Sequence, residues 1–251
     1  MLAITKPRLA GLYASPMVTS VASELAPRGV LRASINLGNP VLAQGTPAAP
    51  AGVTVDIARE IAARLGVPVE YACFDAARKS LAALLSGEAD IGFLAIEPAR
   101  AEQVAFTPPY ALIEGVYAVP EDSPLATVAD VDAPGVRVGV KEGSAYDLHL
   151  TRTLSRASIV RGADGTTVFA AQRLEAAAGI REPVTEFVAS HPGLRLIDGA
   201  FMQIRQSVGV TRGKSAQSLA CLTAILADLK ASGFIASSLR RSGQRAVIPE
   251  G

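Results

Sequence analysis

Arg100 is the side chain whose neighbours in the sequence point most directly to chemistry. It follows an apolar run at residues 90–96, and Pro98 suits the first turn of a helix. A guanidinium beside the free N–H groups of a helix start forms a receptor for a carboxylate or a phosphate. An Arg on a helix surface, paired with Glu97 or Glu102, is the alternative. The residues alone therefore predict either an anion receptor or a surface ion pair.

The other reactive residue types form no recognisable catalytic or metal-binding pattern. His149 falls within an expected helix and His191 in a Ser-His-Pro-Gly turn, and they match no triad or metal spacing. Residues 209–215 imitate a phosphate loop but are one residue short of its spacing. We interpret both histidines as packing or surface residues and residues 209–215 as a strand running into a helix. No metal or cofactor is expected.

Charge balance and hydropathy exclude several classes of protein. The 251 residues include 24 basic and 23 acidic side chains, and this net charge of +1 disfavours general nucleic-acid binding. A mean hydropathy of +0.31 provides the apolar surface for an ordered core. Cys73 and Cys221 are too few for a disulfide scaffold or a Cys-rich zinc site. We expect free buried thiols, or a disulfide if the terminal helix brings the two together.

Two series of alternating strands and helices must position these residues. The apolar strands imply burial on both faces, which is typical of parallel sheets covered by helices. The first series predicts a βαβαβ lobe with strands at residues 29–36, 67–74 and 90–96 and helices at residues 53–65 and 76–87. The second series predicts strands at residues 136–140, 158–161, 174–180 and 194–197 and helices at residues 144–154, 166–172 and 181–190.

Two extended segments, residues 111–119 and 203–211, bracket the second series. If the terminal helices at residues 214–232 and 234–241 pack on the first lobe, the chain crosses between the lobes twice. This pattern predicts two Rossmann-like α/β lobes joined by a two-stranded hinge, with a cleft between them. The expected division is an N-terminal arm at residues 1–28, lobe 1 at 29–112 plus 209–251, and lobe 2 at 113–208.

The N-terminal residues leave the cellular compartment open. Lys6 and Arg8 precede a moderately apolar run at residues 9–18, and residues 20–22 have the small-x-small pattern of a signal cleavage site. Polar and turn-forming residues interrupt the run, so an irregular arm leading into a short helix near residues 20–25 is the alternative. No stretch approaches about 18 continuous apolar residues, and no membrane insertion is expected.

Several short motifs, in their order and spacing, resemble one known family. Residues 96–110, IEPARAEQVAFTPPY, are similar to Ile-Thr-x-x-Arg followed by Phe-Ser-x-Pro-Tyr. Four further segments support the match: residues 52–58, 86–91, 138–144 and 230–234. Over residues 29–243 the chain resembles the family 3 solute-binding proteins, the amino-acid-type periplasmic receptors of ABC importers.

The resemblance implies a receptor in which two lobes close on a small ligand. By position, Arg100 matches the family's bidentate Arg that grips the ligand carboxylate, and this context favours the anion receptor over the surface ion pair. Ser144 matches a second-lobe contact, although capping of its own helix explains it equally well. The resemblance also implies a periplasmic monomer and an ABC permease as partner; without a clear signal peptide, a cytoplasmic location stays open.

Departures from the family pattern concern the ligand. Phe93, Ala95 and Glu97 stand where a Ser or Thr usually precedes the Arg, and Asn39 replaces the usual stacking aromatic residue. On the same alignment, Ile180 replaces the acid that pairs with the ligand's α-ammonium. A buried ammonium without an acceptor costs several kcal/mol by order of magnitude. We therefore expect a small organic acid or an unusual amino-acid derivative in place of an ordinary α-amino acid.

Neutral and acidic side chains complete the expected site. Asn36, Asn39 and Gln203 are candidate neutral contacts, and Glu97 or Glu114 replaces the missing acid if the ligand is cationic. The same two glutamates are candidate general acids for a second interpretation, because cyclohexadienyl dehydratases share this fold. A cytosolic ligand sensor is a third interpretation, although no basic helix-turn-helix segment precedes the lobes.

Overall fold

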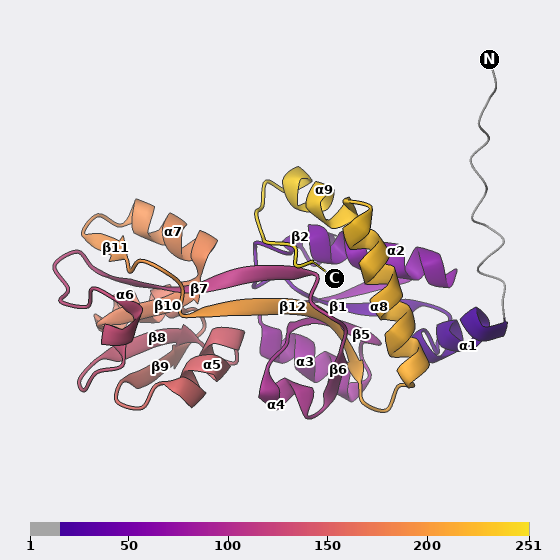
Figure 1. Cartoon of the computed structure of the whole chain (residues 1–251), viewed down its shortest axis with the longest axis horizontal. Helices are drawn as coiled ribbons and strands as arrows, with labels where there is room; N and C mark the ends of the chain where they lie inside the picture. The colour runs from indigo at the N-terminus through magenta and orange to yellow at the C-terminus, as the bar shows by residue number, and fades with distance from the viewer. Residues whose placement is uncertain (1–15, 251) are drawn as a thin grey trace, which may run out of the picture.

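The computed structural model describes residues 16–250, with side chains from Ser20 onward. One mixed sheet runs through the whole molecule in the order β4-β1-β5-β12-β7-β10-β8-β9, and helices cover it at both ends (Figure 1). The two ends form the two α/β lobes that the sequence predicts. The long strands β7 (Ala111–Pro120) and β12 (Met202–Thr211) connect them.

Lobe 1 is built on three parallel strands. β1 (Leu31–Asn36) lies between β4 (Val69–Phe74) and β5 (Ile91–Ala95), pairing Leu31 with Val69 and Ala33 with Ile91. The connecting helices are α2 (Val53–Leu65) and α3 (Ala77–Ser86). Every residue of β5 is buried, as its apolar sequence predicts for a strand covered on both faces. Pro98–Ala101 then form the short helix α4 directly after this strand.

Lobe 2 repeats this arrangement with three parallel strands. β8 (Arg137–Lys141) lies between β9 (Ser158–Gly162) and β10 (Ala176–Ile180). Its helices are α5 (Ala145–Thr153), α6 (Gly165–Gln172) and α7 (Arg181–Ser190). The short strand β11 (Leu194–Leu196) pairs with β7 in the antiparallel direction.

The hinge strands β7 and β12 pair antiparallel in the middle of the sheet. Their register joins Met202 to Gly115 and Gln206 to Ala111. β12 continues into lobe 1 along β5 and β6 (Val104–Phe106), while β7 continues into lobe 2 along β10. The chain thus crosses between the lobes twice, as expected. The boundaries expected at residues 112 and 209 fall within these two strands and stay a prediction.

The terminal helices pack on lobe 1. α8 (Ala216–Ala231) and α9 (Phe234–Arg241) contact α2, and α1 (Pro16–Leu25) contacts both α2 and α8 (Figure 1). The large core cluster joins residues of these helices, such as Leu25 and Leu222, to the strands of both lobes. Within residues 16–250, no single helix is long and apolar enough to cross a membrane. Only the pair α8 and α9, bent by 68°, passes that test together.

Local differences from the expected elements are small and have clear causes. The segment between β1 and α2, rich in Ala, Pro and Gly, contains a two-stranded hairpin, β2 (Gln44–Thr46) and β3 (Ala49–Ala51). A three-residue strand offers too few residues to show a two-residue period, so the sequence pattern did not reveal it. A 3-10 turn at Val128–Val131 was likewise not predicted. The expected signal-like run begins at residues outside the described chain, whereas residues 20–22 lie in α1.

Candidate functional site

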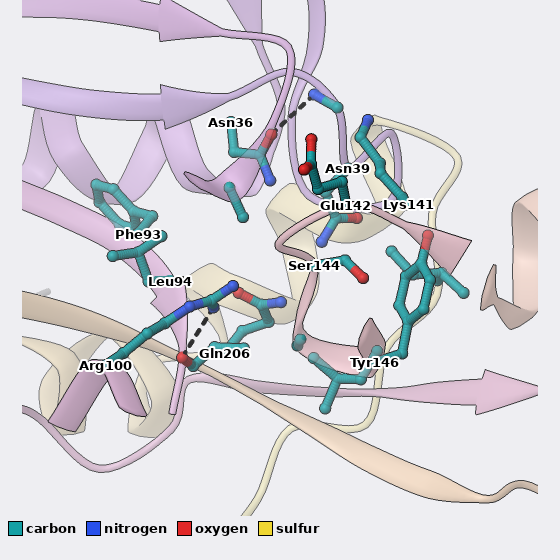
Figure 2. A pocket seen from close by; sticks show the side chains of 16 residues that line it. Asn36, Asn39, Phe93, Leu94, Arg100, Lys141, Glu142, Ser144, Tyr146 and Gln206 are labelled. Carbon is teal, nitrogen blue, oxygen red and sulfur yellow. Dashed lines mark hydrogen bonds between the residues drawn. The ribbon is translucent and has the colours of Figure 1, made fainter. Parts of the chain in front are cut away.

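A cavity lies between the lobes, at the carboxyl ends of their parallel strands (Figure 2). Ligands bind at this edge of open α/β sheets because the strand ends and helix starts converge there. Lobe 1 and the hinge provide part of the lining and lobe 2 the rest. The lining consists of Asn36, Gly38, Asn39, Ala77, Phe93, Leu94, Ala95, Arg100, Lys141, Glu142, Ser144, Ala145, Tyr146, Ile180, Ile204 and Gln206.

Arg100 lies on α4, directly after the buried strand β5, and only 2% of it is exposed. One terminal nitrogen, Nη1, donates to the carbonyl of Ala95 at 3.1 Å. The other, Nη2, donates to the carbonyl of Gly143 in lobe 2 at 3.0 Å. A guanidinium has five N–H donors, so three remain for a ligand after these two hydrogen bonds.

The charge of Arg100 has no carboxylate partner within residues 20–250: none of the ion pairs there includes it. Burial lowers its pKa to about 10, while the nearby charge of Glu97 opposes this shift. Arg100 is therefore still a cation at neutral pH. A buried cation without a counter-ion costs free energy, and an anionic ligand offsets that cost.

The lobe 2 wall of the cavity is held by the start of α5. Ser144 caps this helix, since its Oγ accepts a hydrogen bond from the backbone N–H of Asp147 at 3.0 Å. Asp147 is buried, accepts from the N–H of Gly143 at 2.8 Å and pairs with Arg161. These bonds fix the turn that presents the Gly143 carbonyl to Arg100. Ser144 thus has the capping role that the sequence allowed, and it also lines the cavity.

Three amide side chains add neutral polar groups to the lining. Asn36 Oδ1 accepts from the N–H of Gly38 at 3.0 Å. Asn39 is 6% exposed, and its Oδ1 has no hydrogen-bond partner among the described residues. Gln206, on the hinge strand β12, is also buried at the cavity wall. An unpartnered buried amide oxygen is costly, so Asn39 indicates a polar group on the ligand.

Burial perturbs the aromatic side of the site as well. Tyr146 is 6% exposed and lines the cavity. Burial first, and then the charge of Asp164, raise the pKa of its phenol well above the usual range. Its hydroxyl is therefore protonated at neutral pH. Phe93 closes the lobe 1 side and meets the buried Tyr110 edge-on, with 6.1 Å between the ring centroids.

Four polar contacts join the lobes around the cavity. Besides the bond from Arg100 to Gly143, the Lys141 Nζ donates to the carbonyl of Asp75 at 2.8 Å. Arg78 faces Glu142 at 3.5 Å, and Arg152 pairs with Glu97 at 2.7 Å. Because each contact needs both lobes in place, this arrangement is a closed conformation.

The structure brings together seven of the ten side chains expected at the site. Arg100, Ser144, Ala95, Asn36, Asn39, Phe93 and Ile180 all line the cavity. Three do not. Glu97 is buried but faces Arg152, Glu114 pairs with Arg181 on α7, and Gln203 is exposed on the outer face of β12.

The side chains missed by sequence reasoning come from two places. Gln206 lies on the same strand as Gln203, three residues later and hence on the opposite face. In the sequence, Gln206 has the two-residue spacing of the apolar Ile204 and Val208, and this spacing was a usable signal for it. Lys141 and Glu142 lie within residues 138–144, which were already matched to the family, and Tyr146 follows shortly after. The direction in which these side chains point is set only by the folded end of β8 and the start of α5.

The residues set aside in the sequence lie away from the cavity. His149 stacks on Phe201 with 6.1 Å between centroids, and burial lowers its pKa. His191 is exposed and stacks on Phe187. Cys73 and Cys221 are free and half-buried, and burial raises the pKa of each thiol. No cluster of three metal-binding side chains occurs in the described part of the chain.

The family follows from a match over most of the chain. The model for "Bacterial extracellular solute-binding proteins, family 3" matches residues 37–242. This chain belongs to that family. No match was found among curated proteins. The match covers both hinge strands, lobe 2 and most of lobe 1 of this solute-binding protein, so the resemblance expected from residues 96–110 is confirmed.

Solved structures share the fold of this solute-binding protein. A mutant of ArgBP from T. maritima has a TM-score of 0.72 at 24% identity, covering 89% of this chain and 99% of that one. An amino acid ABC transporter substrate-binding protein from Streptococcus pneumoniae, bound to L-arginine, has a TM-score of 0.73 at 16% identity, covering 90% of this chain and 99% of that one. The ancestral amino acid-binding protein AncCDT-1, a precursor of cyclohexadienyl dehydratase, has a TM-score of 0.70 at 22% identity, covering 88% of this chain and 98% of that one. The predicted fold of two α/β lobes joined by a two-stranded hinge is thereby confirmed, and it is the fold of type II periplasmic binding proteins.

Proposed function

We propose that this solute-binding protein is the receptor of an ABC-type importer and closes on a small ligand that carries a carboxylate. The observation that carries the proposal is Arg100, a buried cation at the cavity wall without a carboxylate partner among residues 20–250. Its free donors and the lobe 2 backbone lie together only when the lobes close. A ligand that bridges them stabilises the closed form, because only contacts made in one state shift the population toward it.

The ligand we infer is an organic acid or an amino-acid derivative that lacks a free α-ammonium. Ile180 lines the cavity where the family pattern has the acid for that ammonium. Among the described residues, Glu142 is the single carboxylate residue in the lining, and it faces Arg78 with 56% of its side chain exposed. Glu97 and Glu114, which the sequence offered as substitutes, have cations of their own. These pairings support a ligand without a cationic group.

A dehydratase-like reaction is the alternative, and one structural relative is described as a dehydratase precursor. A general acid must lie within hydrogen-bond reach of the substrate. Neither of the glutamates nominated for that role is in the cavity lining, which supports a receptor over an enzyme. Turnover of prephenate or arogenate by the purified protein would instead favour the enzyme.

The receptor proposal is tested by ligand capture and by one substitution. Native mass spectrometry of freshly purified protein should reveal a copurified acid, and a thermal-shift screen of organic acids should raise the melting temperature. Arg100→Ala should weaken binding by at least about thirtyfold, because it removes a buried charge partner. Arg212→Ala is the matched control, since this exposed Arg also donates to a backbone carbonyl, that of Ala101, outside the cavity. Equal binding by the Arg100→Ala variant would contradict the proposal.

The partner and the compartment belong to the same proposal. The family suggests an ABC permease that docks the closed receptor, and an extracellular or periplasmic location. Copurification of a permease with the ligand-loaded protein, weakened in the Arg100→Ala variant, is the expected outcome.

A further inference from the structure

Lys141 is a second cation in the cavity lining. It ends strand β8, and Figure 2 shows it beside Asn39 and Glu142, on the side of the lining away from Arg100. Its Nζ donates one hydrogen bond, to the carbonyl of Asp75. An ammonium has three N–H donors, so two remain. The cavity therefore has a cationic group at each of two separate places.

The carboxylates around Lys141 are committed to other groups. Glu142 has Arg78 at 3.5 Å, and Asp75 has Lys79 at 2.8 Å. Asp164, which lines an adjoining hollow with Lys141, caps α6 by accepting from the N–H groups of Thr166 and Thr167. None of the ion pairs within residues 20–250 includes Lys141. Lys141 thus resembles Arg100 in being a cation of the lining without its own carboxylate.

The fold makes room for the Lys141 ammonium at a specific place. Gly38 follows β1, and a Cβ at this position would lie 2.6 Å from the Lys141 Nζ and 2.0 Å from the Asp75 carbonyl oxygen. A larger residue there would displace the ammonium from the cavity wall. The absence of a side chain at Gly38 and the bond to Asp75 together hold the Lys141 cation against lobe 1 in the closed form.

We propose that the site selects a dianionic ligand, one small molecule with an acidic group at Arg100 and a second acidic group at Lys141. This inference rests on the proposed receptor function and names the class of its ligand. The two cations belong to different lobes. A diacid bound to both therefore bridges the lobes, and its two ion pairs form together only when the lobes close. The neutral amides Asn36, Asn39 and Gln206 line the same cavity and match the polar middle of such a ligand, and Ile180 is compatible with the lack of an ammonium.

Calorimetry with matched acids tests this proposal on the full chain. The probes are the dicarboxylates malonate, succinate, glutarate and adipate, each compared with the monocarboxylate of the same carbon number. We expect at least one dicarboxylate to bind about tenfold or more tightly than its monocarboxylate. Lys141→Met should abolish this preference, so that each dicarboxylate and its monocarboxylate bind with similar affinity. Comparing two ligands in one variant separates charge recognition from closure, because a change in closure affects both ligands alike.

Lys230→Met is the control, because Lys230 lies on α8 and does not line the cavity. It should keep the preference for dicarboxylates. Equal affinities of mono- and dicarboxylates for the unaltered protein, or a preference that survives Lys141→Met, would overturn the inference while leaving the receptor intact. No binding of any acid in the series would instead contradict the proposed carboxylate receptor itself.

Discussion

At the scale of single residues, the proposed binding site depends on buried polar groups that lack partners within the described chain. Arg100 is fully buried on the lobe 1 side, and the amide oxygen of Asn39 is buried without a hydrogen bond among the described residues. Such groups are costly in an isolated protein and favourable once a complementary ligand arrives. In the function proposed above, Ile180 is the residue that most directly opposes an ordinary amino acid, because it puts an alkyl group on the cavity wall.

Substitution of Ile180 by Asp tests the role of this residue in excluding amino acids. Ile180 precedes the first residue of α7, a capping position that favours Asp, so the variant should fold. We expect Ile180→Asp to bind at least one α-amino acid about tenfold more tightly than the parent, because the carboxylate accepts from the buried ammonium. Calorimetry measures the change. Ile180→Asn has nearly the same shape without the charge, and an equal gain in that variant would refute the electrostatic explanation.

At the scale of elements, the position of the site depends on how strands β1 and β5 are joined. Asp90 precedes β5 and accepts hydrogen bonds from the backbone and the guanidinium of Arg32 on β1. The side chains of Arg32 and Asp90 are only 11% and 3% exposed. This pair fixes the start of the strand whose other end leads into α4 and Arg100.

Removal of Asp90 should therefore destabilise lobe 1. We expect Asp90→Ala to lower the free energy of unfolding by about 3 kcal/mol, because it leaves the Arg32 charge buried without a partner. Urea denaturation checks the value. The exposed pair of Arg64 and Asp228 provides the control, since 73% of the Asp228 side chain is exposed and Asp228→Ala should cost less than about 1 kcal/mol. Similar losses in the two variants would contradict this interpretation.

At the scale of the whole molecule, the lobes are held closed by contacts outside the ligand cavity as well as inside it. Arg152 on α5 reaches Glu97, which has a side chain only 5% exposed. Separation of the lobes exposes Glu97 to water, whereas closure buries it against Arg152. The pair therefore sets part of the balance between the open and closed forms.

Truncation of Arg152 should shift the balance toward the open form. In Arg152→Ala the closed state buries Glu97 without its cation, so ligand affinity should fall by about tenfold. Small-angle scattering should report a larger radius of gyration for the ligand-free variant than for the ligand-free parent protein. The double variant Arg152→Ala with Glu97→Gln should recover part of the affinity, because no uncompensated charge is left. Unchanged affinity in the single variant would show that the pair does not contribute to closure.

The sequence by itself determined most of the fold. Periodic apolar runs are local, and they predicted α2 at residues 53–65, α7 at residues 181–190 and α9 at residues 234–241 with the same bounds that the structure has. The order of elements and the motif at residues 96–110 were enough to identify the family. Arg100 was found for the same reason, since a Pro-started helix after a buried strand is a local signal.

Only the tertiary structure decided which charges remain for a ligand. Glu97 and Arg152 lie on different lobes, and no local pattern reveals that they pair. No local pattern reveals the pairing of Glu114 with Arg181 either, or the place of Lys141, whose ammonium lies against Gly38 and Asp75 of the other lobe. Ion pairing depends on distances across the closed cleft, whereas sequence patterns report only the periodicity of each element. The sequence therefore determined the two lobes and the Arg100 cation, and the folded cleft decided which of the other charged side chains are paired with one another.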